Sequence, residues 1–239
     1  MQAISNAMTT PILLLTRPEA ASLRFSAQVG AGVEMLISPL LRIDLREVGN
    51  LTPDLRGIIL TSENGAVAAG RIPGLPRRAF CVGERTAAVA HDAGFDPISA
   101  GGDAQALVAL ILSERESGPL LHIRGEHAGG DIAERLNAAG VVTVEVVAYR
   151  QQEQPLSPAA YTAMQGRRVV ILPLFSPRTV SILAKQGPFS APLHAVCIST
   201  AVAEQAKSLR PLSLMTAASP NARSMALAVR TCIDQMMNG

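Results

Sequence analysis

The chain has 239 residues, of which 48% are hydrophobic, and a formal charge of +2 at pH 7. This composition is enough to bury one large core or two modest ones. The sequence contains no long run of Lys or Arg that could follow a phosphate backbone. With 3% aromatic residues and no Trp, it also offers few side chains on which nucleic-acid bases could stack. We therefore expect no nucleic-acid partner.

The sequence also predicts a cytoplasmic protein that does not enter a membrane. No apolar stretch approaches the ~20 residues that span a bilayer, and the first residues lack the layout of a signal peptide. Cys81, Cys197 and Cys232 are odd in number and lack CxxC spacing, which favours reduced thiols in a core. Residues 1–7 resemble the remnant of an expression tag, and Met8 is the expected natural start.

From Pro11 onward, short apolar runs alternate with amphipathic stretches, which is typical of βα units and a mainly parallel sheet. Ala-rich segments such as 84–94 and 103–116 carry apolar residues at helical spacing. The fold class predicted is α/β. The runs that predict strands are 12–16, 33–37, 57–61, 79–82, 120–123, 144–149, 169–174, 194–198 and 212–216.

An internal repeat organises these elements. A long unit recurs, because segments 57–70, 79–94 and 97–112 match 169–185, 194–209 and 214–229 in the same order. A short unit recurs as well, since 12–39 resembles 120–147. Two similar domains follow, each with one short and one long unit. The repeat leaves their pairing open: tandem pairing would divide the chain near 117–119, and nested pairing would need crossings at 40–44 and 148–152.

The turns that follow the predicted strands are the candidate binding segments. In open parallel sheets, ligands bind beyond the carboxyl ends of the strands, where helix N-termini offer free backbone N–H groups. Each Ser or Thr in these turns could instead cap the following helix. If the two domains face each other, the turns would line a cleft suited to a ligand with many carboxylates. These turns are 16–18, 61–65, 83–86, 124–126, 175–177 and 199–200.

Other chemistries find little support in the sequence. There is no GxGxxG fingerprint, no P-loop and no GxSxG elbow, which disfavours nucleotide binding and serine hydrolysis. His122 and His127 have no Cys or Asp cluster nearby, so no metal is expected, and His122 inside an apolar strand predicts a structural histidine. Arg124 either pairs with Glu126 or faces a ligand.

Tyr149 is one of only two tyrosines, and it closes a predicted strand at the second crossing. Its hydroxyl is expected to point into the cleft. A phenol placed there could donate a proton to a departing hydroxyl group, a general-acid role worth ~100-fold or more in rate. The alternative is a packing residue between the domains.

Seven motifs together resemble the uroporphyrinogen-III synthase family in order and spacing, over residues 11–233. They are TRPEA (16–20), LTSENGAV (60–67), CVGERTA (81–87), IRGE (123–126), VVAYR (146–150), FSPRTV (175–180) and AASPNARSMALAV (217–229). The resemblance implies two flavodoxin-like parallel-sheet domains with nested pairing. Residues 8–40 and 152–239 would form the first domain and 44–148 a second domain inserted in it. A two-stranded tether would join them, with the active site in the cleft.

The resemblance also implies the activity: a lyase that needs no cofactor and closes hydroxymethylbilane to uroporphyrinogen III, with loss of water and inversion of ring D. We also expect a monomer. Tyr149 matches the tyrosine credited with assisting hydroxyl loss, and Thr86, Ser62 and Ser176 match further family positions. With the strand-end turns, the predicted substrate-binding set is Arg17, Ser62, Asn64, Thr86, Arg124, Gly125, Ser176, Ser199 and Thr200.

The sequence departs from the family pattern at two places. Ser199 and Thr200 stand where the family often has Gly-Pro-x-Thr, and Glu63 stands where Pro is common. A carboxylate at 63 would repel an anionic substrate unless it turns outward. Two other functions remain open: a two-lobed small-molecule binding protein without chemistry, and a glycosyltransferase that uses a nucleotide sugar, although no acidic metal-binding motif is evident.

Overall fold

The structure is a computed structural model that describes residues 10–30, 32–49, 51, 54–115, 118–127 and 131–238. It is a mixed α/β fold with two largely parallel sheets, and the chain divides into two compact units. Unit 1 combines the described residues up to Arg42 with those from Glu153 onward, and unit 2 is Ile43–Gln152. The chain therefore leaves unit 1 once and returns to it once.

Unit 1 is built on a five-stranded sheet in the order β11-β10-β9-β1-β2. Its neighbouring strands run parallel, and Ile12 lies opposite both Glu34 and Val170. Side chains alternate between the faces: Leu13 packs with the core under α2 and α10, and Leu14 packs with the core under α7, α8 and α9. The strands are β1 (Ile12–Leu15), β2 (Glu34–Ile37), β9 (Val170–Leu174), β10 (Leu193–Cys197) and β11 (Ser213–Thr216). The helices are α2 (Glu19–Val29), α7 (Pro158–Met164), α8 (Pro177–Ala184), α9 (Thr200–Ala206), the short 3₁₀ helix η1 (Lys207–Leu209) and α10 (Ala222–Asn238).

Unit 2 has a six-stranded sheet in the order β3-β8-β7-β4-β5-β6, again with helices on both faces. One core includes the alanines of α3 and α4, and the other includes the branched side chains of α5 and α6. The strands are β3 (Leu41–Leu45), β4 (Gly57–Leu60), β5 (Arg78–Cys81), β6 (Asp96–Ser99), β7 (Leu120–Gly125) and β8 (Thr143–Glu153). The helices are α3 (Glu63–Ala69), α4 (Glu84–Asp92), α5 (Ala104–Ser113) and α6 (Ile132–Ala138).

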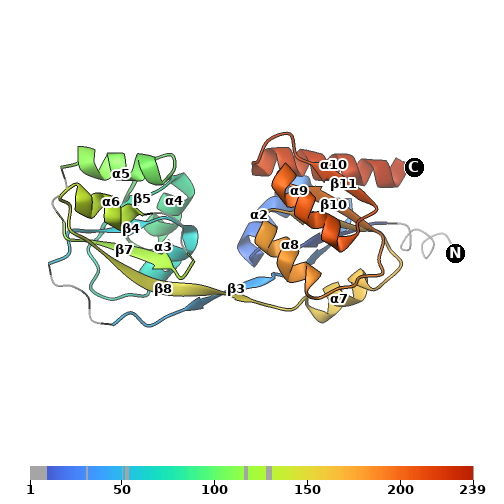
Figure 1. The fold of residues 1–239 in the computed structure, drawn as a ribbon, viewed down its shortest axis with the longest axis horizontal. Helices are drawn as coiled ribbons and strands as arrows, with labels where there is room; N and C mark the ends of the chain where they lie inside the picture. The colour runs from blue at the N-terminus through green and yellow to red at the C-terminus, as the bar shows by residue number, and fades with distance from the viewer. Residues whose placement is uncertain are drawn as a thin grey trace. The chain divides into compact units, whose positions relative to one another are not determined.

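Strands β3 and β8 carry the two passages between the units and lie side by side (Figure 1). The backbone N–H of Arg46 donates to the carbonyl of Ala148 at 2.8 Å, and that of Gln154 donates to Leu40 at 2.9 Å. As residue numbers rise on one strand they fall on the other, so the pair is antiparallel. The side chains of Asp44 and Arg150 form an ion pair across it, with an N–O distance of 2.7 Å.

All of the strands expected from the sequence overlap observed strands. β3 was expected only as one strand of the tether, and β6 was not expected as a strand. β6 reads Asp-Pro-Ile-Ser, and its Pro97 lacks a backbone N–H. Proline is tolerated on edge strands, and β6 lies at the edge of the sheet, paired with β5. The expectation that Tyr149 ends its strand is wrong, because β8 continues to Glu153. The residues after Tyr149 are polar, so the apolar run that predicted this strand stops before the strand itself does.

Each sheet has a point at which the chain connections diverge. In unit 1, β1 leads through α2 to β2 on one side, whereas β9 leads through α8 to β10 on the other. In unit 2, β7 leads to β8 and β4 leads to β5 in opposite directions. Such topological switch points leave a crevice at the carboxyl ends of the two strands, which is where α/β sheets bind ligands. Each unit therefore has its own candidate site, at the ends of β1 and β9 in unit 1 and at the ends of β4 and β7 in unit 2.

The described part of the chain holds no helix with the length and apolar sequence that crossing a membrane requires. Cys81, Cys197 and Cys232 are buried, unpaired thiols. Burial raises the pKa of Cys81 and of Cys197 to about 11, because the thiolate would lose its hydration. These thiols are packing residues of the cores.

Candidate active site

The switch point of unit 2 brings Tyr149 and Ser62 together. Tyr149 comes from β8, next to β7, and Ser62 lies two residues after the end of β4. The phenol oxygen lies 2.8 Å from the Ser62 Oγ, so the two hydroxyls share a hydrogen bond across 87 residues of sequence. Tyr149 is only 7% exposed. The phenol is thus fixed in place by a partner at the end of a neighbouring strand.

Ser62 also caps helix α3. Its backbone is extended, with φ −155° and ψ 155°, and its Oγ accepts the backbone N–H of Gly65 at 3.0 Å. A serine in this geometry satisfies one of the donors left free at a helix start. The Ser62 hydroxyl therefore caps α3 and contacts Tyr149 at the same time, and its role as a substrate-binding residue stays a prediction.

Gly125 explains how the Tyr149 ring fits. It is the last residue of β7, and a register shift in the β7–β8 pairing places it opposite Tyr149. A Cβ at position 125 would lie 2.6 Å from the Tyr149 Cε2 and 2.7 Å from its Cζ, closer than packed carbons allow. The backbone N–H of Glu126 donates to the Tyr149 carbonyl at 3.0 Å. Only glycine leaves room for the ring against this strand end.

A small pocket of about 50 Å³ borders the phenol. Its size suits a water molecule or a hydroxyl group rather than a whole organic ligand. The pocket is lined by Gly125, Glu126, His127, Tyr149 and Gln151. Tyr149 therefore borders a recess that could hold a small polar group.

Arg124 is held within the sheet by Glu145. Its Nε donates to the Glu145 Oε2 at 2.9 Å, and its Nη1 donates to the carbonyl of Gly125 at 3.2 Å. The expectation that Arg124 could pair with Glu126 is wrong. The Glu126 Oε1 lies 3.6 Å from the Arg46 Nη2 instead. The positive charge of Arg124 is compensated by its neighbour on β8, which reduces what it can offer to an anionic ligand.

The other carboxylate oxygen of Glu145 binds His122, with a distance of 2.8 Å to Nδ1. The His122 ring is 1% exposed, and its Nε2 lies 3.4 Å from the Thr61 Oγ1. His122 is a satisfied buried histidine, as the apolar strand predicted. Its pKa is lowered from 6.5, because burial disfavours the imidazolium more strongly than Glu145 favours it.

We expect His122 to make the fold sensitive to mild acid. Because its folded pKa lies below 6.5, the unfolded chain binds a proton more readily, so stability is full above pH ~6.5 and falls as the pH drops below it. The melting temperature should therefore fall between pH 7.5 and 5.5, and the fall should be smaller in the His122→Gln variant, which has no imidazole to titrate. Equal falls in the two proteins would contradict this role.

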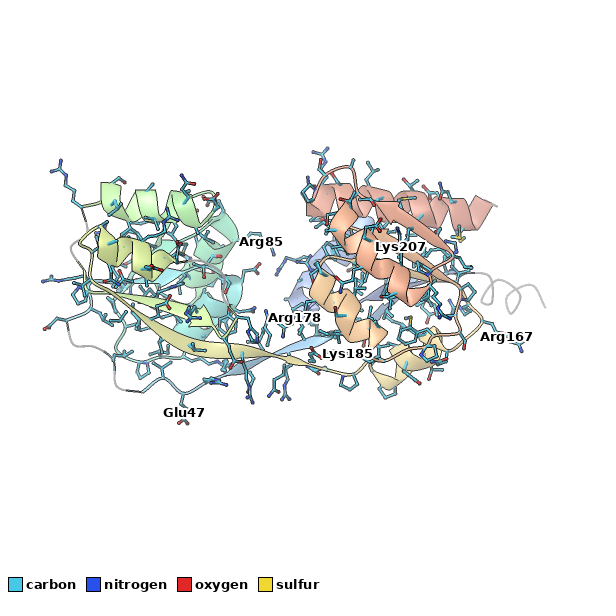
Figure 2. The ribbon with its side chains drawn as sticks, viewed as in Figure 1. Glu47, Arg85, Arg167, Arg178, Lys185 and Lys207 are labelled. Atoms are coloured by element: carbon cyan, nitrogen blue, oxygen red, sulfur yellow. The ribbon has the colours of Figure 1, made fainter. Side chains whose placement is uncertain are left out.

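The remaining predicted residues of unit 2 lie in the first turns of two helices. Asn64 is in α3, and Thr86 is a buried residue of α4. Glu63 forms an ion pair with Arg85, with an N–O distance of 2.5 Å, and Figure 2 shows Arg85 extending from its helix. The repulsion expected between Glu63 and an anionic substrate is therefore offset by a neighbouring cation.

The switch point of unit 1 presents a cation on an aromatic platform. The Arg17 guanidinium, just after β1, lies 4.3 Å from the centre of the Phe175 ring, just after β9. Phe25 from α2 packs edge-on against Phe175, at 5.0 Å between ring centres. The Thr16 Oγ1 is buried there without a protein hydrogen-bond partner. These groups suit an anion that also has apolar surface.

Three hydroxyl residues of unit 1 belong to helix starts. Ser176 caps α8 by accepting the N–H of Thr179 at 3.2 Å, and its Oγ lies 2.9 Å from the Thr179 Oγ1. Ser199 caps α9 by accepting the N–H of Val202 at 3.4 Å, and Thr200 is the first residue of that helix. Among the residues that the structure describes, no group of three or more His, Cys, Asp or Glu side chains is placed to hold a metal ion.

Comparison with known proteins decides the family. The family model described as "Uroporphyrinogen-III synthase HemD" matches residues 25–226, most of the chain. The chain belongs to the uroporphyrinogen-III synthase family. A structure of uroporphyrinogen-III synthetase from Helicobacter pylori 26695 has the same fold, with a TM-score of 0.65 and 15% identity over 93% of this chain and 99% of that one.

A second similar structure is a mutant uroporphyrinogen III synthase from the extremely thermophilic bacterium Thermus thermophilus. It is 13% identical over 95% of this chain and 100% of that one, with a TM-score of 0.47. A search of curated protein sequences gives no match. Membership of the uroporphyrinogen-III synthase family therefore rests on the family model, and the Helicobacter structure agrees with it in fold.

Several residues at the switch points of this synthase-family chain were predicted from the sequence, but their partners were not. Gly65 and Phe175 lie in the candidate turns 61–65 and 175–177, but they were not expected as partners of Ser62 and Arg17. Glu145, the partner of Arg124, lies outside the candidate turns. The repeat offered one signal, since it aligns Ser62 with Ser176. Partnerships between different strands have no local signature, because they depend on strand order.

The close approach at Gly125 gives a direct test. Gly125→Ala should destabilise the fold by about 1–3 kcal/mol, because the Tyr149 ring must move from its site in a packed core. The measurement is chemical denaturation, with Gly49→Ala as the matched control, since a Cβ at 49 meets nothing within 4 Å. Equal stability of the Gly125→Ala variant and the parent would show that the ring does not occupy this position.

Proposed function

We propose that this protein converts hydroxymethylbilane to uroporphyrinogen III, with loss of water and inversion of ring D, as a cofactor-independent lyase of haem biosynthesis. Family membership supports the substrate and the pathway. The observation that carries the chemistry is the hydrogen-bonded Tyr149, held at a topological switch point beside a pocket of water size. The proposed setting is the cytoplasm, and the proposed active form is a monomer without a nucleic-acid partner.

We further propose that the two units are flavodoxin-like domains, with residues 44–148 inserted between the 8–40 and 152–239 parts of the other. The order β2-β1-β9-β10-β11 in unit 1 supports this, because it is the flavodoxin order. In unit 2, the order β8-β7-β4-β5-β6 is the same flavodoxin order if β7 and β8 are counted as the first and second strands and β4, β5 and β6 as the third to fifth. The antiparallel pair β3 and β8 would then be the tether.

The proposed reaction begins with loss of the hydroxyl group. Tyr149 donates its phenolic proton to that oxygen, the carbon–oxygen bond breaks, and water departs, leaving a phenolate and a carbocation conjugated with the first pyrrole. The terminal pyrrole attacks this cation through its substituted carbon and forms a spiro intermediate. In this intermediate, the bond between the substituted carbon of the terminal pyrrole and the bridge carbon to the neighbouring ring then breaks. The terminal pyrrole forms a new bond to that bridge carbon through its other, unsubstituted α-carbon. The proton released on closure returns to the phenolate, so the enzyme is regenerated.

Most of the catalytic effect should come from positioning, because the bilane closes spontaneously to the other isomer. A polycarboxylate substrate needs several hydrogen-bond donors around the reacting groups. The Arg17 guanidinium and the hydroxyl of Ser176 are the proposed donors of unit 1, and Asn64 and Thr86 are those of unit 2. Ser199, Thr200, Arg124 and Gly125 complete the proposed contact set at the strand ends.

The direct test is isomer analysis of the product. Purified protein, prepared free of metal and nucleotide, should convert hydroxymethylbilane mainly to the type III isomer. The alternative function, a binding protein without chemistry, predicts only the spontaneous type I product while the bilane still binds. Type I product alone from folded protein would reject the proposed function.

Replacing the phenol tests the role of Tyr149. Tyr149→Phe should lower the rate of type III formation by about ten-fold or more, because general-acid assistance is lost and the ring still fills its site. Residual type III activity is expected, since substrate positioning remains. Circular dichroism and a melting curve serve as controls for folding. Unchanged turnover would mean that Tyr149 serves packing alone.

A further inference from the structure

The Ser62 hydroxyl sits between two groups of unit 2. It accepts the backbone N–H of Gly65 at 3.0 Å, and it lies 2.8 Å from the Tyr149 phenol oxygen. A serine hydroxyl has one hydrogen to donate and two lone pairs that accept. With one lone pair occupied by Gly65, one lone pair and the hydrogen remain for Tyr149. Ser62 can therefore either accept a hydrogen bond from the phenol or donate one to it.

This freedom matches what a general acid needs from its neighbour. Before the reaction, Ser62 can donate to the phenol oxygen, which leaves the phenolic hydrogen available for the substrate. Once that hydrogen has been transferred, the same donation stabilises the phenolate, since hydrogen bonds to charged acceptors are the stronger ones. The Gly65 N–H keeps the Ser62 oxygen in place, and the Gly125 backbone leaves the ring room to reach it.

We propose that Ser62 is the positioning residue of Tyr149: it orients the phenol and donates its own hydrogen to the phenolate formed when the substrate hydroxyl departs. This inference rests on the proposed function of Tyr149. It differs from the role implied by family resemblance, in which Ser62 binds the substrate directly.

The internal repeat supports a specialised role for Ser62. Ser176 occupies the equivalent strand end in unit 1 and caps its helix in the same extended conformation, with φ −156° and ψ 151°. Its hydroxyl is shared with Thr179 rather than with a tyrosine. The capping geometry is thus common to both copies of the repeat, whereas the phenol partner occurs with Ser62. Helix capping alone does not explain why the hydroxyl of a buried tyrosine is hydrogen-bonded to this serine.

The chain is well suited to a spectroscopic test that needs no substrate. It has two tyrosines and no Trp, so Tyr161→Phe leaves Tyr149 as the only phenol. Tyr161 lies on α7 and is 47% exposed, so this background variant should fold normally. In that background, the tyrosinate absorbance of Ser62→Ala should develop about one pH unit higher than in the parent, because the phenolate has lost a hydrogen-bond donor.

Two further variants separate this effect from loss of the helix cap. Ser62→Thr keeps the hydroxyl and should restore the titration of the parent. Ser157→Ala removes a serine cap from α7, where the Ser157 Oγ accepts the N–H of Ala160 at 3.3 Å, and should leave the titration unchanged. Circular dichroism at each pH identifies the range in which all variants stay folded. A Ser62→Ala titration that coincides with the parent over this range would overturn the proposal.

A double-mutant cycle tests the same role during turnover. Ser62→Ala should lower the rate of type III formation by about ten-fold, mainly in kcat, when Tyr149 is present. In the Tyr149→Phe background the same change should have little further effect, because there is no phenolate to stabilise. An equal loss in both backgrounds would overturn the proposal and favour direct substrate binding by Ser62. If the parent makes no type III product, the proposed function fails, while the absorbance titration still tests the pairing of Ser62 with Tyr149.

Discussion

The contact of Tyr149 with the ends of two neighbouring strands is the constraint on which the candidate site depends. The ring lies against Gly125 at the end of β7, and the hydroxyl meets Ser62 just after β4. Both contacts require β4 and β7 to be neighbours and to end at the same edge of the sheet. The divergence of the chain at this pair creates that edge, so the topology of unit 2 fixes the phenol before any substrate binds. Such preorganisation is what a general acid requires, because a misplaced proton donor loses most of its effect.

Unit 1 repeats the design with different chemistry. Its switch point carries the Arg17 guanidinium stacked on Phe175, and its strand-end serine, Ser176, caps a helix as Ser62 does. An arginine on an aromatic ring offers charge and a flat apolar surface together, which matches a ligand made of pyrrole rings with carboxylate side chains. Under the proposed function, both units bind carboxylates of the substrate, and unit 2 also supplies the group that transfers the proton.

Much of the fold could be predicted from the sequence, because alternating apolar runs and a long internal repeat determine strand positions directly. The strands that escaped prediction show the limits of such patterns: β6 contains Pro97, and the end of β8 beyond Tyr149 is polar. The α/β class and the capping serines followed from local signals. The partner of Arg124 did not, because Glu145 faces it from β8, and that neighbour is known only once the strand order is known. The narrow space at Gly125 likewise depends on a register shift between two strands.

The most direct test is the structure of the protein bound to an unreactive bilane that carries a methyl group in place of the hydroxymethyl group. We expect this methyl to lie beside the Tyr149 phenol, Ser62 to remain bonded to that phenol, and carboxylates of the ligand to contact the strand ends. A bilane bound at the amino ends of the strands, or with its methyl group far from Tyr149, would rule out the proposed roles of Tyr149 and Ser62.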